Sequence, residues 1–365
     1  KVVLFQEEAL TKVDPHRMGV TMMQEFRKGL EQELARAGRT QHEIKQAVTQ
    51  FSSLASHANP TTVSRSLVEE EILKPAIKAL EDGLSQDGDI DRRLSSMLAG
   101  AYSRIGLPEK AIAIYQKSFE RMRENYGDEN PLTLILMNQF SRTLMRHHKS
   151  SDFDKTRAFL EKALELNTRV LGRDAEDSLN AADNLGEFLM SSERYNEAEP
   201  FFRKTLAARK RVFGESSLET LTSLQNLAQF LPKQGKANEG VEYARKALEL
   251  SKRLNGEEHS STLLGYGLVG ASLLAQEKFD ESVKYLQKVL QLSRKLKGED
   301  HPMTLRAMAQ VGKMLSKVGK KDESEAILLR HLEINRRIYG DDVPETVEAT
   351  THLINIFQAH GKHDE

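Results

Sequence analysis

The chain has 365 residues, and its 53 Lys and Arg nearly balance its 54 Asp and Glu. That balance argues against binding dominated by nucleic acid or anionic membranes, and the absence of Cys excludes thiol catalysis, disulfides and thiolate metal sites. No stretch approaches the roughly 18 apolar residues of a membrane span, and no signal peptide is visible. We expect a soluble, cytoplasmic protein, and we interpret its start at Lys1, without Met, as that of a fragment or processed product.

Residues 1–66 are predicted to form a helical N-terminal extension that does not share the sequence repeat of the rest of the chain. A helix is expected from Thr21 to Ala37, because its apolar residues recur at three- and four-residue spacing. Thr40 and Glu43 then have the spacing of a capping box, in which each side chain binds the backbone N–H of the other residue. The helix that they begin ends before Asn59-Pro60. We assign no function to this extension.

Residues 67–126 are predicted to hold the first repeat unit with a leading helix. That helix runs from Ser66 to Leu84 and is kinked at Pro75, which lacks a backbone N–H. Asp87-Gly88-Asp89 is expected to end this helix before a second helix begins at Asp91–Ile105. The alternating Asp residues resemble the start of a calcium loop, but Arg and Leu stand where that loop needs Gly and Glu. We therefore interpret the segment as a linker and N-cap.

Six glycines in near-identical settings divide the rest of the chain. Gly127, Gly172, Gly214, Gly256, Gly298 and Gly340 are separated by 45, 42, 42, 42 and 42 residues. A fixed period of this size indicates stacked structural units. The predicted units are residues 127–171, 172–213, 214–255, 256–297, 298–339 and the incomplete 340–365. The three extra residues of the first of these units lie around His147 to Asp152, between its two helices, and the last unit contributes one helix at Pro344–Ala359.

Several units carry a Leu- or Val-plus-small pair followed by a bulky residue, a turn and a small residue. Examples are Leu98-Ala99, Tyr102, Gly106 and Ala111, and later Leu227-Ala228, Leu231, Gly235 and Gly240. This pattern resembles the tetratricopeptide repeat, and the 42-residue period with the Gly298–Leu305 segment is similar to the kinesin-light-chain-like subfamily. The resemblance covers about residues 90–360. It implies an all-α, right-handed solenoid of about six and a half helix-pair units spanning residues 67–365.

Three apparent motifs have structural interpretations. Gly265-Tyr266-Gly267-Leu268-Val269-Gly270 matches a dinucleotide fingerprint, but it falls within a helical pattern without a preceding strand, so Gly270 is interpreted as a helix-packing position. Asp152-Phe153-Asp154 resembles the Asp-Phe-Gly motif of kinases but lacks its glycine, so Asp152 is expected to be the N-cap of a second helix. His147-His148 is interpreted as a solvated pair, since a metal site needs three or four ligands. We predict no catalytic residues, metal or cofactor.

The resemblance implies that the first helix of each pair lines a concave groove. The inward positions are rich in amides, which suit an extended peptide backbone because they both donate and accept. The predicted groove residues are Asn138, Gln139, Arg142, Asn180, Asn184, Glu187, Gln225, Asn226, Gln229, Arg306, Gln310, Lys313 and Asn355. Asp183, Thr222 and His352 fall on the same face, and an apolar stretch at Leu264, Gly267, Leu268 and Ala271 interrupts it.

These features predict a non-catalytic module that binds a protein or peptide partner and neither nucleic acid nor membrane. A second hypothesis is that the chain is the sensory or docking region of a larger bacterial Ser/Thr protein kinase, because Leu4-Phe5 to Asp14-Pro15 and the following helix resemble the segment after the kinase domain and membrane helix in some of those proteins. A third is a structural scaffold that self-associates through its ends. The oligomeric state is left open by the sequence.

Overall fold

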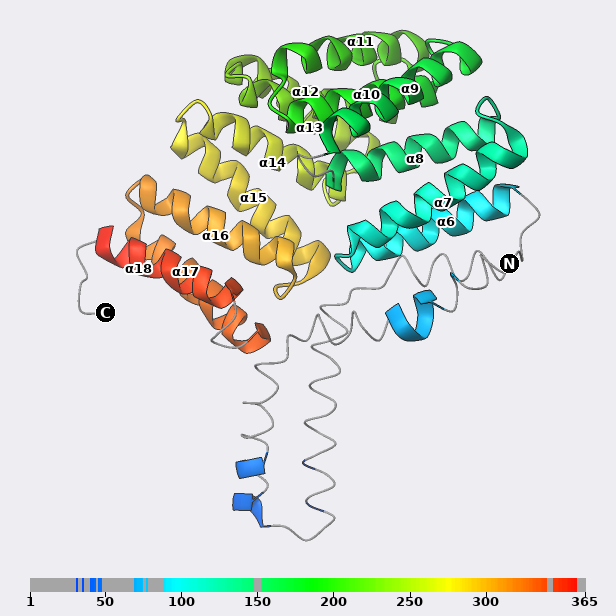
Figure 1. Ribbon diagram of the computed structural model, residues 1–365. Helices are drawn as coiled ribbons and strands as arrows, with labels where there is room; N and C mark the ends of the chain where they lie inside the picture. The colour runs from blue at the N-terminus through cyan, green and yellow to red at the C-terminus, as the bar shows by residue number, and fades with distance from the viewer. Residues whose placement is uncertain are drawn as a thin grey trace. The chain divides into compact units, whose positions relative to one another are not determined.

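The computed structural model describes residues 31, 35, 40–43, 45–47, 69–74, 77, 88–147, 152–339 and 344–359. Within those ranges every regular element is a helix, and no strand occurs (Figure 1). The described chain is therefore an all-α solenoid of helix pairs, as the repeat period predicts. It divides into two compact units, residues 1–188 and 189–365, and each is treated by itself.

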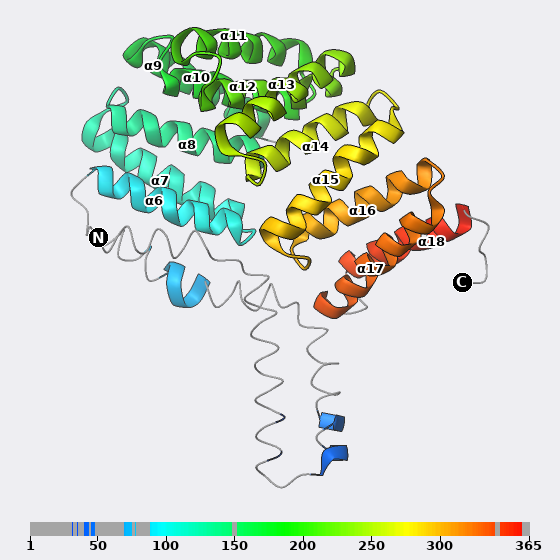
Figure 2. The ribbon, with the colours of Figure 1, turned by 180° about the vertical axis from the view of Figure 1, so that it is seen from behind.

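In the first compact unit a short π-helix precedes the paired α-helices. Its elements are η1 (Glu69–Leu73), α6 (Gly88–Arg104), α7 (Pro108–Tyr126), α8 (Pro131–His147), α9 (Phe153–Leu171) and most of α10 (Glu176–Ser191). Helices α6, α7 and α8 lie side by side in both views (Figure 1, Figure 2). Leu98, Tyr102 and Met122 are buried between them. The Leu-plus-small pair of the first repeat thus packs in the core, as predicted.

The second compact unit is a stack of helices in which each packs on the next along the chain. Its elements are α11 (Tyr195–Phe213), α12 (Leu218–Lys233), α13 (Ala237–Asn255), α14 (Ser260–Leu274), α15 (Phe279–Lys297), α16 (Pro302–Lys317), α17 (Lys321–Tyr339) and α18 (Pro344–Ala359). One apolar cluster runs from Ala228 on α12 to Ile334 on α17. The bounds of α18 are those predicted from the sequence.

The repeated glycines end the second helix of each pair. Gly172, Gly214, Gly256 and Gly298 are C-caps with φ between +86° and +95°, and Gly127 follows α7 with φ +84°. L-residues rarely adopt that left-handed conformation, which explains why glycine recurs here. Gly340, the sixth predicted member, lies outside the described residues.

A hydroxyl six residues after each of four glycines fixes the turn into the next unit. The side chains of Ser178, Thr220, Thr262 and Thr304 donate to the carbonyl oxygens of Gly172, Gly214, Gly256 and Gly298 at 2.7–2.8 Å. These hydroxyls are buried in the first turn of each first helix. They bind carbonyl groups that the preceding helix leaves without an intrahelical partner.

The turn within each pair uses a second left-handed position. Gly106, Gly235 and Gly319 have φ of +78° to +83°, as their turn role predicts, and Glu193 and Glu277 occupy the matching place with φ of 60° and 59°. Glutamate in that conformation is strained by about 1–2 kcal/mol relative to glycine. Two of the repeats therefore hold a side chain where their neighbours have none.

The predictions for the N-terminal residues have mixed outcomes. The capping box is confirmed, since the Thr40 backbone N–H donates to Glu43 Oε2 at 2.8 Å and the Glu43 N–H donates to Thr40 Oγ1 at 3.3 Å. The helix expected from Thr21 to Ala37 lies outside the described residues except at positions 31 and 35, as does Pro75. Leu73 of η1 is fully buried against α6 and α7.

The predicted break at Asp87-Gly88-Asp89 is wrong in part. Helix α6 already begins at Gly88, three residues before the expected Asp91. Asp91 is not an exposed linker or N-cap residue but is buried, and its carboxylate accepts two hydrogen bonds of 2.6 Å from Arg121 on α7. Ser95 and Ser118 also donate to it at 3.1 Å. Burial of a paired carboxylate allowed the helix to extend through these acidic residues.

The three-residue insertion lies where it was predicted. Helix α8 ends at His147 and α9 begins at Phe153, with Asp152 in the N-cap position. The Asp152 side chain makes no capping hydrogen bond, so the predicted N-cap is correct in position but not in its hydrogen bond.

Candidate functional site

The predicted groove residues lie on first helices of the pairs. Some of their side chains form hydrogen bonds with other helices, and others form none with any described residue. In the first compact unit, Asn138 is buried on α8 and exchanges two hydrogen bonds of 3.1 Å with the side chain of Asn167 on α9. It also donates to the Asp177 carbonyl oxygen. Asn184 is buried too, and its Nδ2 donates to the Asn138 carbonyl oxygen at 3.3 Å. These two amides join helices to one another.

The neighbouring positions on α8 and α10 form a charged cluster. Arg142 and Arg146 are exposed on α8, while Asp183 and Glu187 lie on α10. Burial raises the pKa of the Glu187 carboxyl and the Asp183 charge adds to that rise, whereas Arg146 and Arg142 oppose it. The cluster therefore combines two solvent-facing cations with a carboxyl that ionises less readily than usual.

Two further amides flank this cluster. Gln139 accepts a hydrogen bond from Ser96 of α6, so its side chain bridges two successive first helices. Asn180 is half-buried and is engaged within the protein. The first compact unit thus presents mainly arginine to solvent on this face.

In the second compact unit fewer of the predicted residues form hydrogen bonds within the protein. The side chains of Asn226, Gln229, Arg306 and Gln310 form no hydrogen bond or ion pair with any described residue. Gln229, Arg306 and Gln310 are exposed, whereas Asn226 is half-buried. Gln225 holds its Nε2 buried without a partner among the residues that the structure covers. Amide donors and a guanidinium are therefore available on α12 and α16.

The apolar stretch on α14 proves to be partly exposed and partly packed. Leu264 is 47% exposed, while Leu268 is buried. An added Cβ at Gly265 would meet the Leu248 backbone at 3.0 Å, and one at Gly270 would meet Leu286 at 3.2 Å, whereas the nearest atom to a Cβ at Gly267 is 4.0 Å away. The G-x-G-x-x-G sequence is thus confirmed as a helix-packing feature inside α14.

At the last helices, two histidines lie beside Lys313. His331 of α17 is buried and His352 of α18 is half-buried, and each holds Nδ1 without a hydrogen-bond partner in the described part of the chain. Burial lowers the pKa of His331 to about 4, with contributions from His352 and Lys313 that Glu348 opposes. Burial also lowers the pKa of His352. Lys313 is therefore the principal cation here at neutral pH, and Asn355 is exposed nearby along α18.

A pocket of about 520 Å³ lies between α7, α8 and α9 of the first compact unit. Phe119, Phe140 and Phe159 line its interior and contact one another at ring-centroid distances of 4.9–6.5 Å. His147, Asp152 and Lys155 line it on the side of the three-residue insertion. His147 is exposed there, as predicted, whereas His148, the other member of the predicted pair, lies outside the described residues. Among the described residues no cluster of three metal-ligating side chains occurs.

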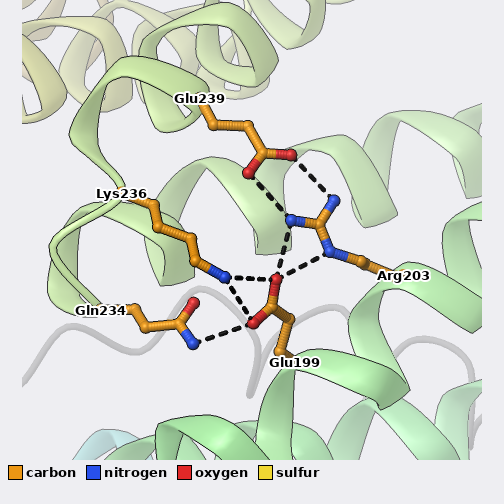
Figure 3. A network of polar contacts seen from close by, with 5 residues as sticks. All are labelled: Glu199, Arg203, Gln234, Lys236 and Glu239. Carbon is orange, nitrogen blue, oxygen red and sulfur yellow. Dashed lines mark hydrogen bonds and ion pairs between the residues drawn. The ribbon is translucent and has the colours of Figure 1, made fainter.

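Sequence analysis did not identify the polar network of the second compact unit. Glu199 of α11 accepts hydrogen bonds from Lys236 at 2.8 Å and Gln234 at 2.9 Å, while Arg203 binds Glu239 of α13 through two nitrogens at 2.8 and 2.9 Å (Figure 3). Burial alone would raise the pKa of Glu199, but hydrogen bonds from Lys236, Gln234 and Arg203 outweigh burial and lower it to about 2. In the sequence, a basic and an acidic residue about 36 positions apart, such as Arg203 and Glu239, indicate such an ion pair between successive second helices.

Models of the tetratricopeptide repeat match residues 177–231 and 261–335, and a second such model matches residues 220–261. No curated protein matches the chain. No helix in the described part of the chain is long and apolar enough to cross a membrane.

Solved structures of low sequence identity share the fold. A signal-transduction ATPase with a tetratricopeptide-repeat sensor from Pyrococcus horikoshii has a TM-score of 0.57 and 14% identity, over 87% of this chain and 45% of that chain. The quorum sensor NprR from B. thuringiensis has a TM-score of 0.55 and 15% identity, over 93% and 95%. BtubC from P. vanneervenii has a TM-score of 0.52 and 18% identity, over 64% and 93%. The family models thus identify tetratricopeptide repeats within residues 177–335, and these solved structures share the fold of the chain.

Proposed function

We propose that the chain is a non-catalytic interaction module that binds an extended segment of a partner protein along its first helices. The observation that carries the proposal is the difference between the two kinds of amide. The side-chain amides of Asn138 and Asn184 hydrogen-bond to neighbouring helices. The side chains of Asn226, Gln229 and Gln310 have no hydrogen-bond partner in the described chain. An extended backbone offers both donors and acceptors, and these amides can match both.

The charges on the same helices favour a segment with acidic groups. Neither Arg306 nor Lys313 makes an ion pair with any described carboxylate, and the charge of Lys313 helps to lower the pKa of both His331 and His352. Arginine binds carboxylates in a bidentate manner and with charge assistance. NprR is a quorum sensor and the Pyrococcus protein has a repeat sensor, so proteins of this fold include sensors; the likeness in sequence is too low to carry their ligands over.

Peptide selection tests the proposal. Peptides of about 12 residues selected from a random display library on the wild-type chain should contain Asp or Glu. Their affinity should fall at least about tenfold for the Asn226→Ala, Arg306→Ala, Lys313→Ala variant, since each lost charged hydrogen bond costs about 1.5–3 kcal/mol. The matched control replaces Lys246, Lys284 and Gln287, which are exposed on second helices, and should leave affinity unchanged. Equal affinity for both variants would contradict the proposal.

A further inference from the structure

A recurring ion pair joins the turn between two repeats to the second helix of the following pair. An acidic residue two positions after the repeat glycine binds a basic residue in the last turn of that helix. Three such pairs occur in the described chain: Arg169 with Glu129 at 2.7 Å, Lys295 with Glu258, and Arg337 with Asp300. The position two residues after the glycine is therefore one at which these repeats place a negative charge.

One repeat keeps the basic residue of this pair and lacks the acidic one. Ser216, in the turn between α11 and α12, stands where the other units have Glu129, Asp174, Glu258, Asp300 and Asp342. Arg253 of α13 lies 42 residues before Lys295, and its Nη2 donates to Ser216 Oγ at 2.7 Å. Arg253 makes no ion pair with any described carboxylate. A guanidinium thus faces a neutral hydroxyl where its counterparts face an anion.

The Ser216 hydroxyl is accessible, whereas that of the adjacent Ser217 already has a structural role. Ser216 is exposed and lies outside both helices, between Phe213 and Leu218. Ser217 is the half-buried N-cap of α12, and its Oγ accepts a hydrogen bond from the Thr220 backbone N–H at 3.1 Å. Of the two hydroxyls, only that of Ser216 can therefore be modified without loss of the cap.

We propose that Ser216 is a phosphorylation site, and that its phosphate binds Arg253 as the carboxylates of the other repeats bind their basic partners. A Ser/Thr protein kinase supplies the phosphoryl group from ATP. The bond from Ser216 Oγ to the γ-phosphorus forms, the bond from that phosphorus to the departing ADP oxygen breaks, and the hydroxyl proton passes to a base of the kinase. The product carries a charge of about −1.5 to −2 at pH 7.

The surroundings of Ser216 suit this product. Arginine binds phosphate through two parallel N–H···O bonds, which are stronger than the bond to a neutral hydroxyl. The adjacent carboxylate of Glu215 is paired with Lys210 at 3.1 Å, which limits its repulsion of the phosphate. Glu215 and Glu219 also make the segment around Ser216 acidic. By charge complementarity, the kinase that modifies it has a basic substrate groove.

The pairing with Arg253 can be tested by genetic encoding of phosphoserine at position 216. Phosphorus-31 NMR should show the second ionisation of this phosphate at a lower pH than the value near 6 of free phosphoserine. The thermal unfolding midpoint should rise by about 1–3 °C over that of the unmodified chain. Arg253→Gln removes the guanidinium and should abolish both effects. A phosphate that titrates at the same pH with and without Arg253 would overturn the proposed pairing.

The occurrence of the modification is tested on the chain isolated from the cells that produce it. Mass spectrometry should find the peptide that holds Ser216 and Ser217 heavier by one phosphoryl group, and its fragment ions should place that group on Ser216. The Ser216→Ala chain expressed in the same cells should lack it. An unmodified Ser216 in the natural chain, or a phosphate on Ser217 instead, would refute the assignment of the site.

Discussion

Single residues show how burial decides whether a polar side chain is structural. Asp91 and Asn138 look in sequence like exposed acidic and amide residues, yet both are buried and paired with the following helix. A buried polar group without a partner costs about 1–3 kcal/mol, so its position is fixed by its partner. The exposed amides Gln229 and Gln310, which have no partner among the described residues, are under no such constraint and remain available to a ligand.

The glycines of α14 permit a matched pair of substitutions. Gly265→Ala should lower the thermal unfolding midpoint, because the new Cβ lies 3.0 Å from the Leu248 backbone, which cannot move aside easily. Gly267→Ala should raise it, since its Cβ meets nothing closer than 4.0 Å and alanine is favoured over glycine in a helix by about 1 kcal/mol. Thermal unfolding followed by circular dichroism measures both. Shifts of the same sign in the two variants would refute this assignment of packing positions.

At the scale of elements, the periodic hydroxyls stabilise the turn between repeats. Thr262→Val should destabilise the protein by about 1–2 kcal/mol, because it leaves the Gly256 carbonyl oxygen without its 2.7 Å hydrogen bond. The control is Thr222→Val, since the Thr222 hydroxyl is exposed and donates within its own helix. Urea unfolding measures both variants. An equal loss in the two would mean that the turn hydroxyl has no special role.

The contact of α17 with α18 should depend on pH through His331. Its pKa is about 4 in the folded protein, below its usual 6.5, so the unfolded chain binds the proton first as pH falls. Stability is thus full above pH 6.5 and is lost as pH falls toward 4, by up to about 3 kcal/mol. His352, Glu348 and Lys313 surround this imidazole, and Glu348 opposes the shift.

Replacement of His331 by leucine should remove this dependence. Unfolding of His331→Leu at pH 7.5 and pH 4.5 should show a smaller difference than the wild type shows. His147→Gln changes an exposed histidine at the end of α8 and should keep the wild-type difference. If His331→Leu retains the full difference as well, other groups must carry the pH dependence.

At the scale of the whole molecule, the period in the sequence predicts most of the fold. The spacing of the glycines identifies the helix pairs, the insertion after His147 and the bounds of α18 because each depends on local patterns and backbone conformation. It cannot show which amides on a first helix meet a neighbour. Asn138 and Asn226 both fall on that helix face in sequence, but only the first lies within 3.1 Å of an asparagine on the next helix.

The central claim is that a partner segment binds along the first helices rather than along the second. A photo-crosslinking residue placed at Gln229 or Gln310 should label a selected peptide, because both positions are exposed on first helices and lack partners in the described chain. The same residue at Lys246 or Gln287, exposed on second helices, should not label it. Labelling from the second helices alone would contradict the account.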